Sequence, residues 1–128
     1  MNPTVLIVDD EPMTRNLLRL MLERSGFDIL EAEDGLKALA AVAENRPDLL
    51  ILDVMMPNMD GITVCERLRA DVNTAVLPII LLSARTSAEA VRAGLDAGAN
   101  KYVGKPVSRT DLLDHVREVL NTTPQATD

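Results

Sequence analysis

Side chains that could hold a cation or a phosphate follow three apolar stretches of this chain. Asp9 and Asp10 come directly after the first stretch, and Asp53 directly after the second; Lys105 stands shortly after the third. Such stretches are typical of strands buried on both faces of a parallel sheet. Because the carboxyl ends of parallel strands meet at one edge of an open sheet, we expect these four residues to be neighbours. Three carboxylates beside one ammonium group suit a cation and phosphate site better than an apolar core.

The composition indicates a single acidic domain with an aliphatic core. The chain has 128 residues, 47% of them apolar, with no Trp, one Phe and one Tyr. This length fits one domain that buries a core without disulfides. The formal net charge of −7 argues against a nucleic-acid-binding face, because phosphate backbones need clustered Lys and Arg.

The location is predicted from three features. A single cysteine, Cys65, cannot form an internal disulfide, which suits a reducing compartment. The N-terminus has no basic segment ahead of an apolar one. The longest apolar run, Ala75–Leu82, contains Pro78 and is too short to span a membrane. We therefore expect a soluble, cytoplasmic protein without membrane contact.

Hydrophobic periodicity alternates between the patterns of strands and of helices. Five strand-type runs are each followed by a segment with apolar residues three and four positions apart, as on one face of a helix. Ser25-Gly26 is typical of the end of the first helix, and Thr86 to Glu89 has the spacing of a capping box before the fourth. The strands are expected at Thr4–Val8, Phe27–Glu31, Leu49–Leu52, Pro78–Leu82 and Asn100–Val103.

This alternation predicts an α/β fold, in which a doubly wound parallel sheet carries helices on both faces. The common flavodoxin-like strand order, 2-1-3-4-5, places the switch point between strands 1 and 3, whose ends carry Asp10 and Asp53. We assign the domain to residues 1–121. The polar segment 122–128 is expected to be a disordered tail.

Four short motifs follow one another along the chain: Val8–Pro12, Leu52–Gly61, Ser83-Ala84 and Gly98–Pro106. In this order and spacing they resemble the receiver domain of two-component response regulators. Each motif alone is unspecific, but the four together are specific. The resemblance implies a phosphorylation-dependent signalling switch rather than a metabolic enzyme. The resemblance runs from about Thr4 to Leu120.

The resemblance implies roles for the residues that could bind phosphate. Asp53 would be the phosphoacceptor, whose carboxylate oxygen attacks the phosphorus of a phosphohistidine donor. Lys105 would offer a movable ammonium group to the acquired phosphate. Ser83 would add a hydroxyl donor and Ala84 an unobstructed main-chain N–H. The site would thus catalyse its own phosphorylation and a slow autodephosphorylation.

A divalent cation has to accompany this reaction, because an anionic carboxylate repels an anionic phosphoryl group. We expect Mg²⁺, with Mn²⁺ as a substitute. By resemblance, Asp10 and Asp53 would be direct ligands and Asp9 a ligand through water. The main-chain carbonyl of Met55 would be a further ligand, and waters would complete an octahedron.

The resemblance also implies a switch and its partners. The phosphate would draw Ser83 inward, and Tyr102 would fill the vacated space, which changes the face formed by the fourth helix, fifth strand and fifth helix. Lys101 stands in that face where receivers commonly have an acidic residue. The expected partners are a sensor histidine kinase or a histidine phosphotransfer protein, and a downstream target that the sequence does not specify. Homodimerisation through the same face is a further expectation, whereas nucleic-acid binding by this domain is not.

Two positions bear on the lifetime of the phosphate. Met55 and Arg85 occupy positions that tune this lifetime in the family. Met55 cannot orient a hydrolytic water by hydrogen bonding, and Arg85 could shield the phosphate. We therefore expect a long-lived acyl phosphate.

Each site residue also has a plainer interpretation, which the sequence leaves open. Asp9 or Asp10 could cap the first helix, because Pro12 suits a first-turn position. Asp53 could be a turn aspartate. The plainer interpretations of the remaining residues are a loop hydroxyl for Ser83, an exposed loop amine for Lys105, strand packing for Tyr102, a buried apolar side chain for Cys65 and a solvated helix position for His115.

Three other classes of protein compete with this interpretation. A phosphohydrolase of the haloacid-dehalogenase type would need a second Asp two residues after Asp53, where Met55 stands. A flavodoxin-like cofactor binder would need a phosphate-cradling loop after the first strand, but Asp9–Pro12 is anionic and lacks glycine. A degenerate receiver that acts as an unphosphorylated scaffold would lack a competent side chain, and every site position here is filled.

Overall fold

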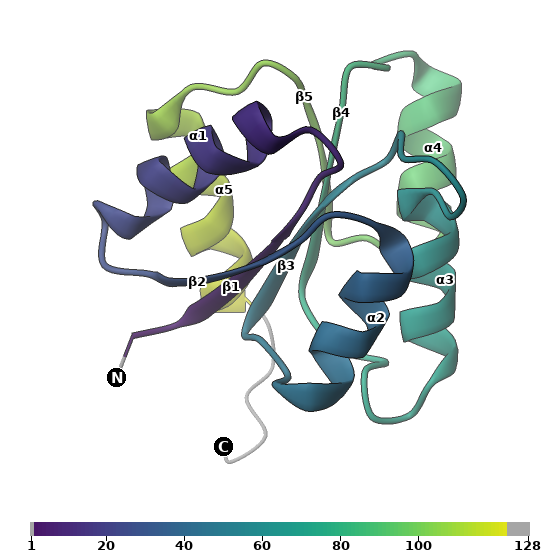
Figure 1. Ribbon diagram of the computed structural model, residues 1–128. Coiled ribbons are helices and arrows are strands. Elements are labelled where there is room, and N and C mark those ends of the chain that lie inside the picture. Colours follow the sequence, from purple (N-terminus) through teal and green to yellow (C-terminus); the bar gives the residue numbers. More distant parts are fainter. Residues whose placement is uncertain (1, 123–128) are drawn as a thin grey trace.

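Strands and helices alternate throughout residues 2–122, the part of the chain that the computed structural model describes (Figure 1). The strands are β1 (Thr4–Val8), β2 (Asp28–Ala32), β3 (Leu49–Asp53), β4 (Ile79–Ser83) and β5 (Lys101–Gly104). The helices are α1 (Pro12–Glu23), α2 (Gly35–Glu44), α3 (Gly61–Ala70), α4 (Ala88–Asp96) and α5 (Arg109–Thr122). The predicted alternation is confirmed over this range.

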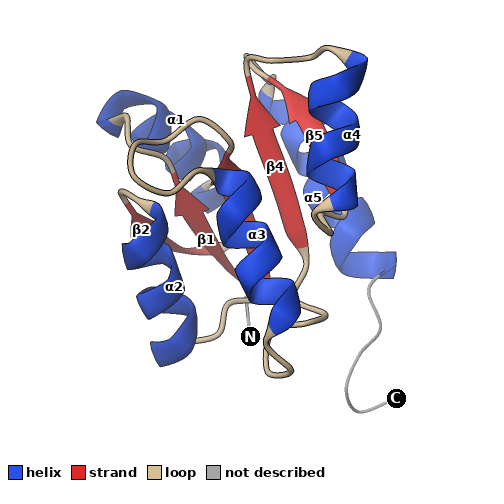
Figure 2. Cartoon of the chain, turned by 90° about the vertical axis from the view of Figure 1, so that its right-hand side faces the viewer, coloured by secondary structure: helices blue, strands red, loops and turns tan. Residues whose placement is uncertain are grey.

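All five strands are parallel and lie in the predicted order β2-β1-β3-β4-β5. Helices α1 and α5 cover one face of the sheet, and α2, α3 and α4 lie on the other (Figures 1 and 2). The switch point therefore lies between β1 and β3. In a sheet of this kind the crevice beyond the carboxyl ends of those two strands is the place for a ligand.

The sheet divides an aliphatic core into two clusters. In β1, Val5 and Ile7 belong to the cluster beneath α1 and α5, whereas Leu6 and Val8 belong to the cluster beneath α2 and α3. All residues of β3 are buried. Side chains alternate between the faces, so a strand covered on both faces has to be apolar along its whole length. Each fully buried Leu or Ile stabilises the fold by about 1.5–3 kcal/mol, and the resulting rigid sheet fixes the strand ends.

The predicted carboxyl ends of β2 to β5 were one residue short. Asp53 is paired with Leu82 in the ladder, and Ser83 with Gly104. For β3 and β4 the prediction stopped at the last apolar side chain, Leu52 or Leu82, but the ladder is made by main-chain groups and continues through the polar residue that follows. As a consequence, Asp53 and Ser83 are held by the sheet itself rather than by mobile loops.

The predicted cap of α4 was also wrong by one residue. Ser87 is the N-cap, and its Oγ accepts a hydrogen bond from the main-chain N–H of Ala90 over 3.2 Å. Thr86 instead lies over β5, where a Cβ added to Gly104 would stand 2.8 Å from its Cγ2. The two neighbouring hydroxyl residues satisfy the same sequence rule, and packing against β5 decides between them.

The last described residue, Thr122, belongs to α5. The rest of the predicted tail, residues 123–128, lies outside the described residues, so the boundary at residue 121 stays a prediction. Within residues 2–122, every helix is too short or too polar to cross a lipid bilayer.

Candidate functional site

The end of β1 holds Asp9 in a buried position, where the residue is 2% exposed. Its Oδ1 accepts a hydrogen bond from the main-chain N–H of Glu11 over 2.9 Å, and its Oδ2 accepts one from Nζ of Lys105 over 2.9 Å. Helix α1 begins at Pro12, as predicted, with Glu11 as an N-cap that makes no side-chain capping bond. The interpretation of Asp9 or Asp10 as a helix cap is therefore wrong.

Asp53, the last residue of β3, lies beside Lys105. The residue is 7% exposed, and its Oδ1 is 3.3 Å from Nζ of Lys105. The main-chain N–H of Met55 donates to the same oxygen over 3.3 Å, so Asp53 closes a turn in addition to forming the ion pair. The main-chain N–H of Lys105 donates to the carbonyl of Ser83 over 2.8 Å, which ties the lysine to β4. Lys105 thus bridges Asp9 and Asp53, and its interpretation as an exposed loop amine is wrong.

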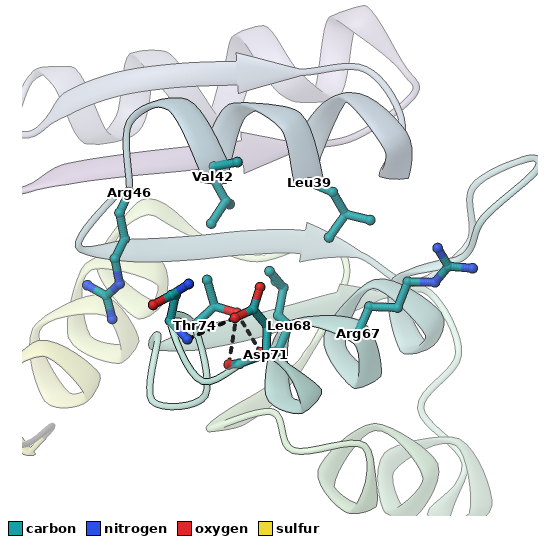
Figure 3. A pocket seen from close by; sticks show the side chains of 9 residues that line it. Leu39, Val42, Arg46, Arg67, Leu68, Asp71 and Thr74 are labelled. Atoms are coloured by element: carbon teal, nitrogen blue, oxygen red, sulfur yellow. Dashed lines mark hydrogen bonds between the residues drawn. The ribbon is translucent and has the colours of Figure 1, made fainter.

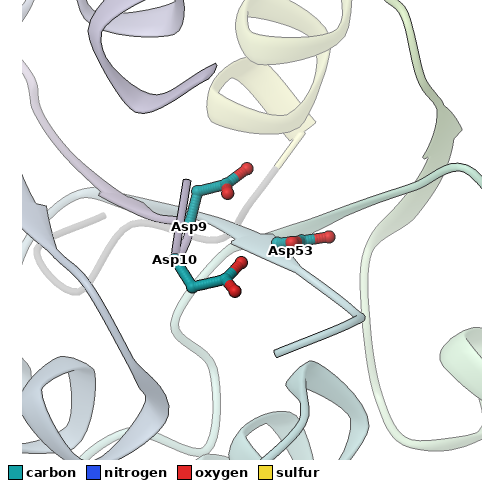
Figure 4. A group of neighbouring side chains, drawn as sticks. All are labelled: Asp9, Asp10 and Asp53. Carbon is teal, nitrogen blue, oxygen red and sulfur yellow. The ribbon is translucent and has the colours of Figure 1, made fainter. Parts of the chain in front are cut away.

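Asp10 completes a cluster of three carboxylates. One oxygen each from Asp9, Asp10 and Asp53 lies within 4.8 Å of the others. Figure 4 shows Asp9 and Asp10 together at the end of β1, with Asp53 across from them at the end of β3. Asp10 is exposed, whereas the other two are buried. Oxygen ligands that face solvent on one side fit Mg²⁺ or Mn²⁺, because Mg²⁺ usually keeps several of its waters.

Burial raises the pKa of the Asp53 carboxyl; the negative charge of Asp9 adds to this effect, and the Lys105 ammonium group opposes it without cancelling it. For Lys105, burial alone would lower the pKa. The hydrogen bond to Asp9 and the charges of Asp53 and Asp9 outweigh burial, so the pKa of Lys105 is raised. One lysine therefore does not neutralise the cluster, and a divalent cation would relieve the remaining repulsion.

We expect Asp53→Asn to stabilise the metal-free protein by on the order of 1 kcal/mol at pH 7. Because the pKa of Asp53 is raised, the folded state holds its proton more tightly than the unfolded chain does. The contribution of Asp53 to stability is thus fully present below about pH 4 and is lost as the pH rises through the folded-state pKa. Urea unfolding without metal, from pH 4 to pH 7, should show the advantage of the variant growing with pH. A variant less stable than the wild type at pH 7 would contradict this account.

The start of α3 approaches the main chain of Asp53 so closely that only glycine fits. A Cβ added to Gly61 would stand 2.4 Å from the carbonyl oxygen of Asp53 and 2.9 Å from Cα of Val54. The main-chain N–H of Gly61 donates to the carbonyl of Val54 over 2.9 Å, and Asp60 caps the helix by accepting from Thr63 over 2.8 Å. Gly61 was placed within the motif Leu52–Gly61 from the sequence, but this contact with Asp53 was not identified.

Gly61→Ala is expected to destabilise the fold by about 2–3 kcal/mol, because the added methyl group meets main-chain atoms that cannot rotate away. The variant should also bind Mg²⁺ more weakly, since relief of the clash displaces Asp53. Gly26→Ala is the matched control. Gly26 has a φ of +91° and no atom within 4 Å of an added Cβ, so its cost, about 1 kcal/mol, is conformational and remote from the site. Urea unfolding and Mg²⁺ titration of both variants test this; equal Mg²⁺ affinities would count against the contact.

Ser83 and Ala84 lie at the same edge of the sheet, and the hydroxyl of Tyr102 reaches toward it from within β5. Ser83 is fully buried in β4, and its Oγ accepts a hydrogen bond from the main-chain N–H of Arg85 over 3.0 Å. The hydroxyl of Tyr102 donates to the carbonyl of Arg85 over 2.7 Å, and its ring lies against Gly94, where a Cβ would stand 2.6 Å from Cδ2. Within residues 2–122, neither side chain bonds to Asp53. Their predicted roles as switch residues therefore stay predictions.

Two hollows are lined by neighbours of the carboxylate cluster, but none of its three aspartates lines either of them. One, of about 460 Å³, is lined by Met55 and Arg85, the two residues predicted to tune phosphate lifetime, together with Val54, Met56 and Asp60. The other, of about 360 Å³, is lined by Lys105, Ala84 and residues of α1. Lys105 and Met55, which both bond to Asp53, thus each border a hollow.

The hollow in Figure 3 belongs to a different part of the molecule. It lies between the carboxyl-terminal turns of α2 and α3, at the opposite end of α3 from Gly61, and has a volume of about 510 Å³. Arg46 and Arg67 stand at its two ends, and Val42 and Leu68 line it between them (Figure 3). None of the predicted site residues lines it, so it is not part of the candidate site.

The remaining titratable candidates serve the fold. Cys65 is buried, as predicted, with its Sγ 3.4 Å from the carbonyl of Ala97. The prediction for His115 was wrong, because its Nδ1 is 3.0 Å from Nζ of Lys101, which also bonds to Oε2 of Glu118 over 2.7 Å. Sequence periodicity places His115 on α5 but does not show that β5 presents a lysine opposite it.

Comparison with known families decides between the competing classes of protein. The family model described as the response regulator receiver domain matches residues 5–117. The chain belongs to this family. The strand order and the acidic pocket of this receiver agree with two-component, phosphorylation-dependent signalling. Receivers of response regulators are signalling proteins and not metabolic enzymes, so the phosphohydrolase and the cofactor binder are excluded.

The receiver is similar to curated bacterial regulators. It is 41% identical over 127 residues to the DNA-binding dual master transcriptional regulator RpaA of Synechocystis sp. (strain ATCC 27184 / PCC 6803 / Kazusa), an alignment that covers 97% of this chain and 53% of RpaA. The receiver thus spans about half the length of the curated relatives it matches.

Solved structures share its fold. A candidate response regulator from Chloroflexus aurantiacus J-10-fl has a TM-score of 0.91 and 39% identity, covering 94% of this chain and 99% of that chain. The receiver domain of the sensor histidine kinase PA1611 from Pseudomonas aeruginosa PAO1 has a TM-score of 0.88 and 27% identity, covering 95% and 100%. In the Pseudomonas structure a magnesium ion is coordinated in the active site cleft.

Proposed function

We propose that this receiver accepts a phosphoryl group on Asp53, in a Mg²⁺-dependent reaction, from a sensor histidine kinase or a histidine phosphotransfer protein. The observation that carries the proposal is the bridge of Lys105 between Asp9 and Asp53, over 2.9 and 3.3 Å, beside the exposed Asp10. One place thus combines a nucleophile, ligands for a cation and an ammonium group for a phosphate.

The hydrogen bonds of Asp53 indicate which oxygen reacts. Oδ1 is engaged by Lys105 and by the main-chain N–H of Met55, which leaves Oδ2 for attack. Oδ2 attacks the phosphorus, the phosphorus–nitrogen bond of the phosphohistidine breaks, and its electron pair returns to the imidazole ring; the product is an acyl phosphate. Lys105 then turns on its flexible stem toward the acquired phosphate and keeps Asp9 as its second partner. Ser83 and Ala84 supply further donors.

Asp10 and Asp53 would hold a Mg²⁺ or Mn²⁺ ion directly, Asp9 would hold it through water, and the main-chain carbonyl of Met55 would be a further ligand. When bound, the ion supplies positive charge to the carboxylate and phosphoryl oxygens. The compact carboxylate cluster supports this assignment, as does the magnesium ion of the Pseudomonas receiver.

The exposed apolar side chains of α1 support a docking site for the phosphodonor protein. Met13, Leu17 and Leu20 are 80%, 53% and 44% exposed. Leu17 also lines the hollow of about 360 Å³ that reaches Lys105. A helix of the donor that packs on this surface would bring its phosphohistidine to Asp53.

The proposed output surface is formed by α4, β5 and α5. Tyr102 reaches from β5 to the loop that precedes α4, and Lys101 pairs with Glu118 of α5. Phosphorylation would act through Ser83 and Tyr102 on this surface, and homodimerisation through it stays a prediction. The downstream target, whether a DNA-binding segment as in RpaA or another protein, and the cytoplasmic location likewise stay predictions.

Intact-mass spectrometry after incubation with acetyl phosphate and Mg²⁺ tests the proposal. The expected result is the gain of one phosphoryl group per chain. An unchanged mass without release of phosphate would instead support an unphosphorylated scaffold. Continuous release of phosphate without a stable adduct would contradict the proposal.

The phosphorylated form is expected to persist for minutes or longer in Mg²⁺ buffer. Met55 is 49% exposed beside Asp53 and offers no hydrogen bond to a hydrolytic water, and Arg85 lines the same hollow. Met55→Asn adds an amide that can orient water and should shorten the lifetime severalfold. Decay of the phosphorylated form, followed by intact mass, measures the lifetime in the wild type and in Met55→Asn. Loss of the label from the wild type within seconds would contradict the expectation.

A further inference from the structure

A chain of hydrogen bonds connects β2 to the peptide bond between Asp9 and Asp10. Nη1 of Arg15, on α1, donates to the main-chain carbonyl of Asp9 over 2.7 Å. Nε of Arg15 donates to Oε1 of Glu31, on β2, over 2.9 Å. The Arg15 side chain is 18% exposed, and its bond to Asp9 is partly buried, whereas its bond to Glu31 is exposed. A guanidinium group holds two acceptors in a fixed relative position because its donors are rigidly arranged.

Asp10 is the carboxylate that needs such support. Asp9 and Asp53 are buried and accept hydrogen bonds, whereas Asp10 is exposed and, within residues 2–122, its side chain accepts none. The carbonyl of Asp9 and the N–H of Asp10 belong to one planar peptide unit. A bond that fixes this carbonyl therefore also fixes the main chain from which the Asp10 side chain extends.

We infer that Arg15, held by Glu31, is a positioning residue that orients the Asp9–Asp10 peptide, and through it the Asp10 carboxylate, for Mg²⁺. This inference rests on the proposed function, because it assigns a support to the same cation site. Arg15 acts through the main-chain carbonyl of Asp9 rather than on the cation. Partners outside the ligand shell of a metal site typically contribute about 10- to 100-fold in metal affinity.

A merely structural role for Arg15 makes different predictions. Glu31 also accepts a hydrogen bond from Nη1 of Arg19 over 3.2 Å, so both arginines tie α1 to β2 through one carboxylate. Of these two arginines, only Arg15 reaches the carbonyl of Asp9. Arg19→Met thus removes a comparable ion pair and leaves the peptide bond supported, which makes it the matched control.

The charge of Arg15 and its positioning role have effects of opposite sign. Loss of a cation near three carboxylates would by itself strengthen the binding of Mg²⁺. Loss of the positioning bond would weaken it. Arg15→Lys keeps the charge but not the fork that joins Glu31 to Asp9, so it separates the two effects.

Calorimetric titration of Mg²⁺ into the metal-free protein, without any phosphodonor, tests the inference. We expect the dissociation constant for Mg²⁺ to be about 10-fold higher in Arg15→Met, and to rise by a similar factor in Arg15→Lys. The dissociation constant of Arg19→Met should stay within about twofold of the wild-type value, because an exposed ion pair contributes little. Glu31→Gln keeps the shape of the side chain and should cause an intermediate loss of Mg²⁺ affinity. This variant tests the inference if an arginine variant does not fold.

The outcomes separate this inference from the proposed function. Tighter or unchanged Mg²⁺ binding by Arg15→Met, or an equal loss in Arg19→Met, overturns the positioning role while the cation site stands. Failure of the wild type to bind Mg²⁺ overturns the proposed function, and the inference with it. The amide resonance of Asp10 in the metal-free protein gives a second readout, which should shift in Arg15→Met and not in Arg19→Met.

Discussion

Asp53→Asn should lower the rate of phosphorylation by acetyl phosphate in Mg²⁺ by more than about 10³-fold, because a carboxamide oxygen is a poor nucleophile and removal of a nucleophile is among the most damaging changes to a site. Burial and the neighbouring charge of Asp9 raise the pKa of Asp53, but at pH 7 the wild-type carboxylate is available once a cation offsets the repulsion. Intact mass followed over time measures the rate for both proteins.

Asp60→Asn is the matched control for this loss. Asp60 caps α3, seven residues after Asp53, and its Oδ1 accepts a hydrogen bond from the main-chain N–H of Thr63 over 2.8 Å. Asparagine caps a helix about as well as aspartate, so this variant should fold and be phosphorylated at close to the wild-type rate. Phosphorylation of Asp53→Asn at the wild-type rate would place the acceptor elsewhere in the chain.

Withdrawal of divalent cations by a chelator should slow phosphorylation by about 10²- to 10³-fold, since the ion contributes several kcal/mol by offsetting the charge of the reacting groups. Lys105 is the only cation that pairs with Asp9 and Asp53 among the described residues, and one positive charge does not balance three carboxylates. Rate measurements across a Mg²⁺ titration should show saturation, and excess Mg²⁺ should restore the rate.

The variant Asp10→Asn tests whether the Mg²⁺ dependence of phosphorylation involves Asp10. Asp10 is exposed and lies within 4.8 Å of the other two carboxylates, so its substitution should cost little stability. The Mg²⁺ concentration for half-maximal rate should rise by about tenfold or more, because a direct ligand matters at least as much as its outer partners. An unchanged Mg²⁺ dependence in this variant would remove Asp10 from the site.

Much of the fold and of the site follows from the pattern of side chains. A strand buried on both faces has to be apolar throughout, so β1, β3 and β4 are visible as runs in the sequence, and the polar residue that ends each run marks the edge where ligands bind. Asp53 and Lys105 were predicted to meet for this reason. The same reasoning ended the strands too early, because the polar Asp53 and Ser83 still take part in the ladder.

The residues that sequence reasoning missed act through main-chain contacts. Gly61 matters because α3 begins close to the main chain of Asp53: a Cβ added to Gly61 would stand 2.4 Å from the carbonyl oxygen of Asp53. Arg15 matters because it reaches the carbonyl of Asp9. Both contacts are made to main-chain carbonyl oxygens, which every residue has. The side chains in the sequence therefore do not indicate these contacts. Thr86 and Ser87 are a similar case, since either hydroxyl could cap α4 and the packing on Gly104 selects Ser87.

A crystal structure of the receiver with Mg²⁺ and beryllofluoride, a mimic of the phosphoryl group, tests the central claim most directly. We predict the mimic on Asp53, the ion in contact with Asp10 and Asp53, and Nζ of Lys105 on a fluoride. Beryllofluoride or Mg²⁺ bound away from Asp53, or an ammonium group of Lys105 still turned from the ligand, would contradict the proposed reaction.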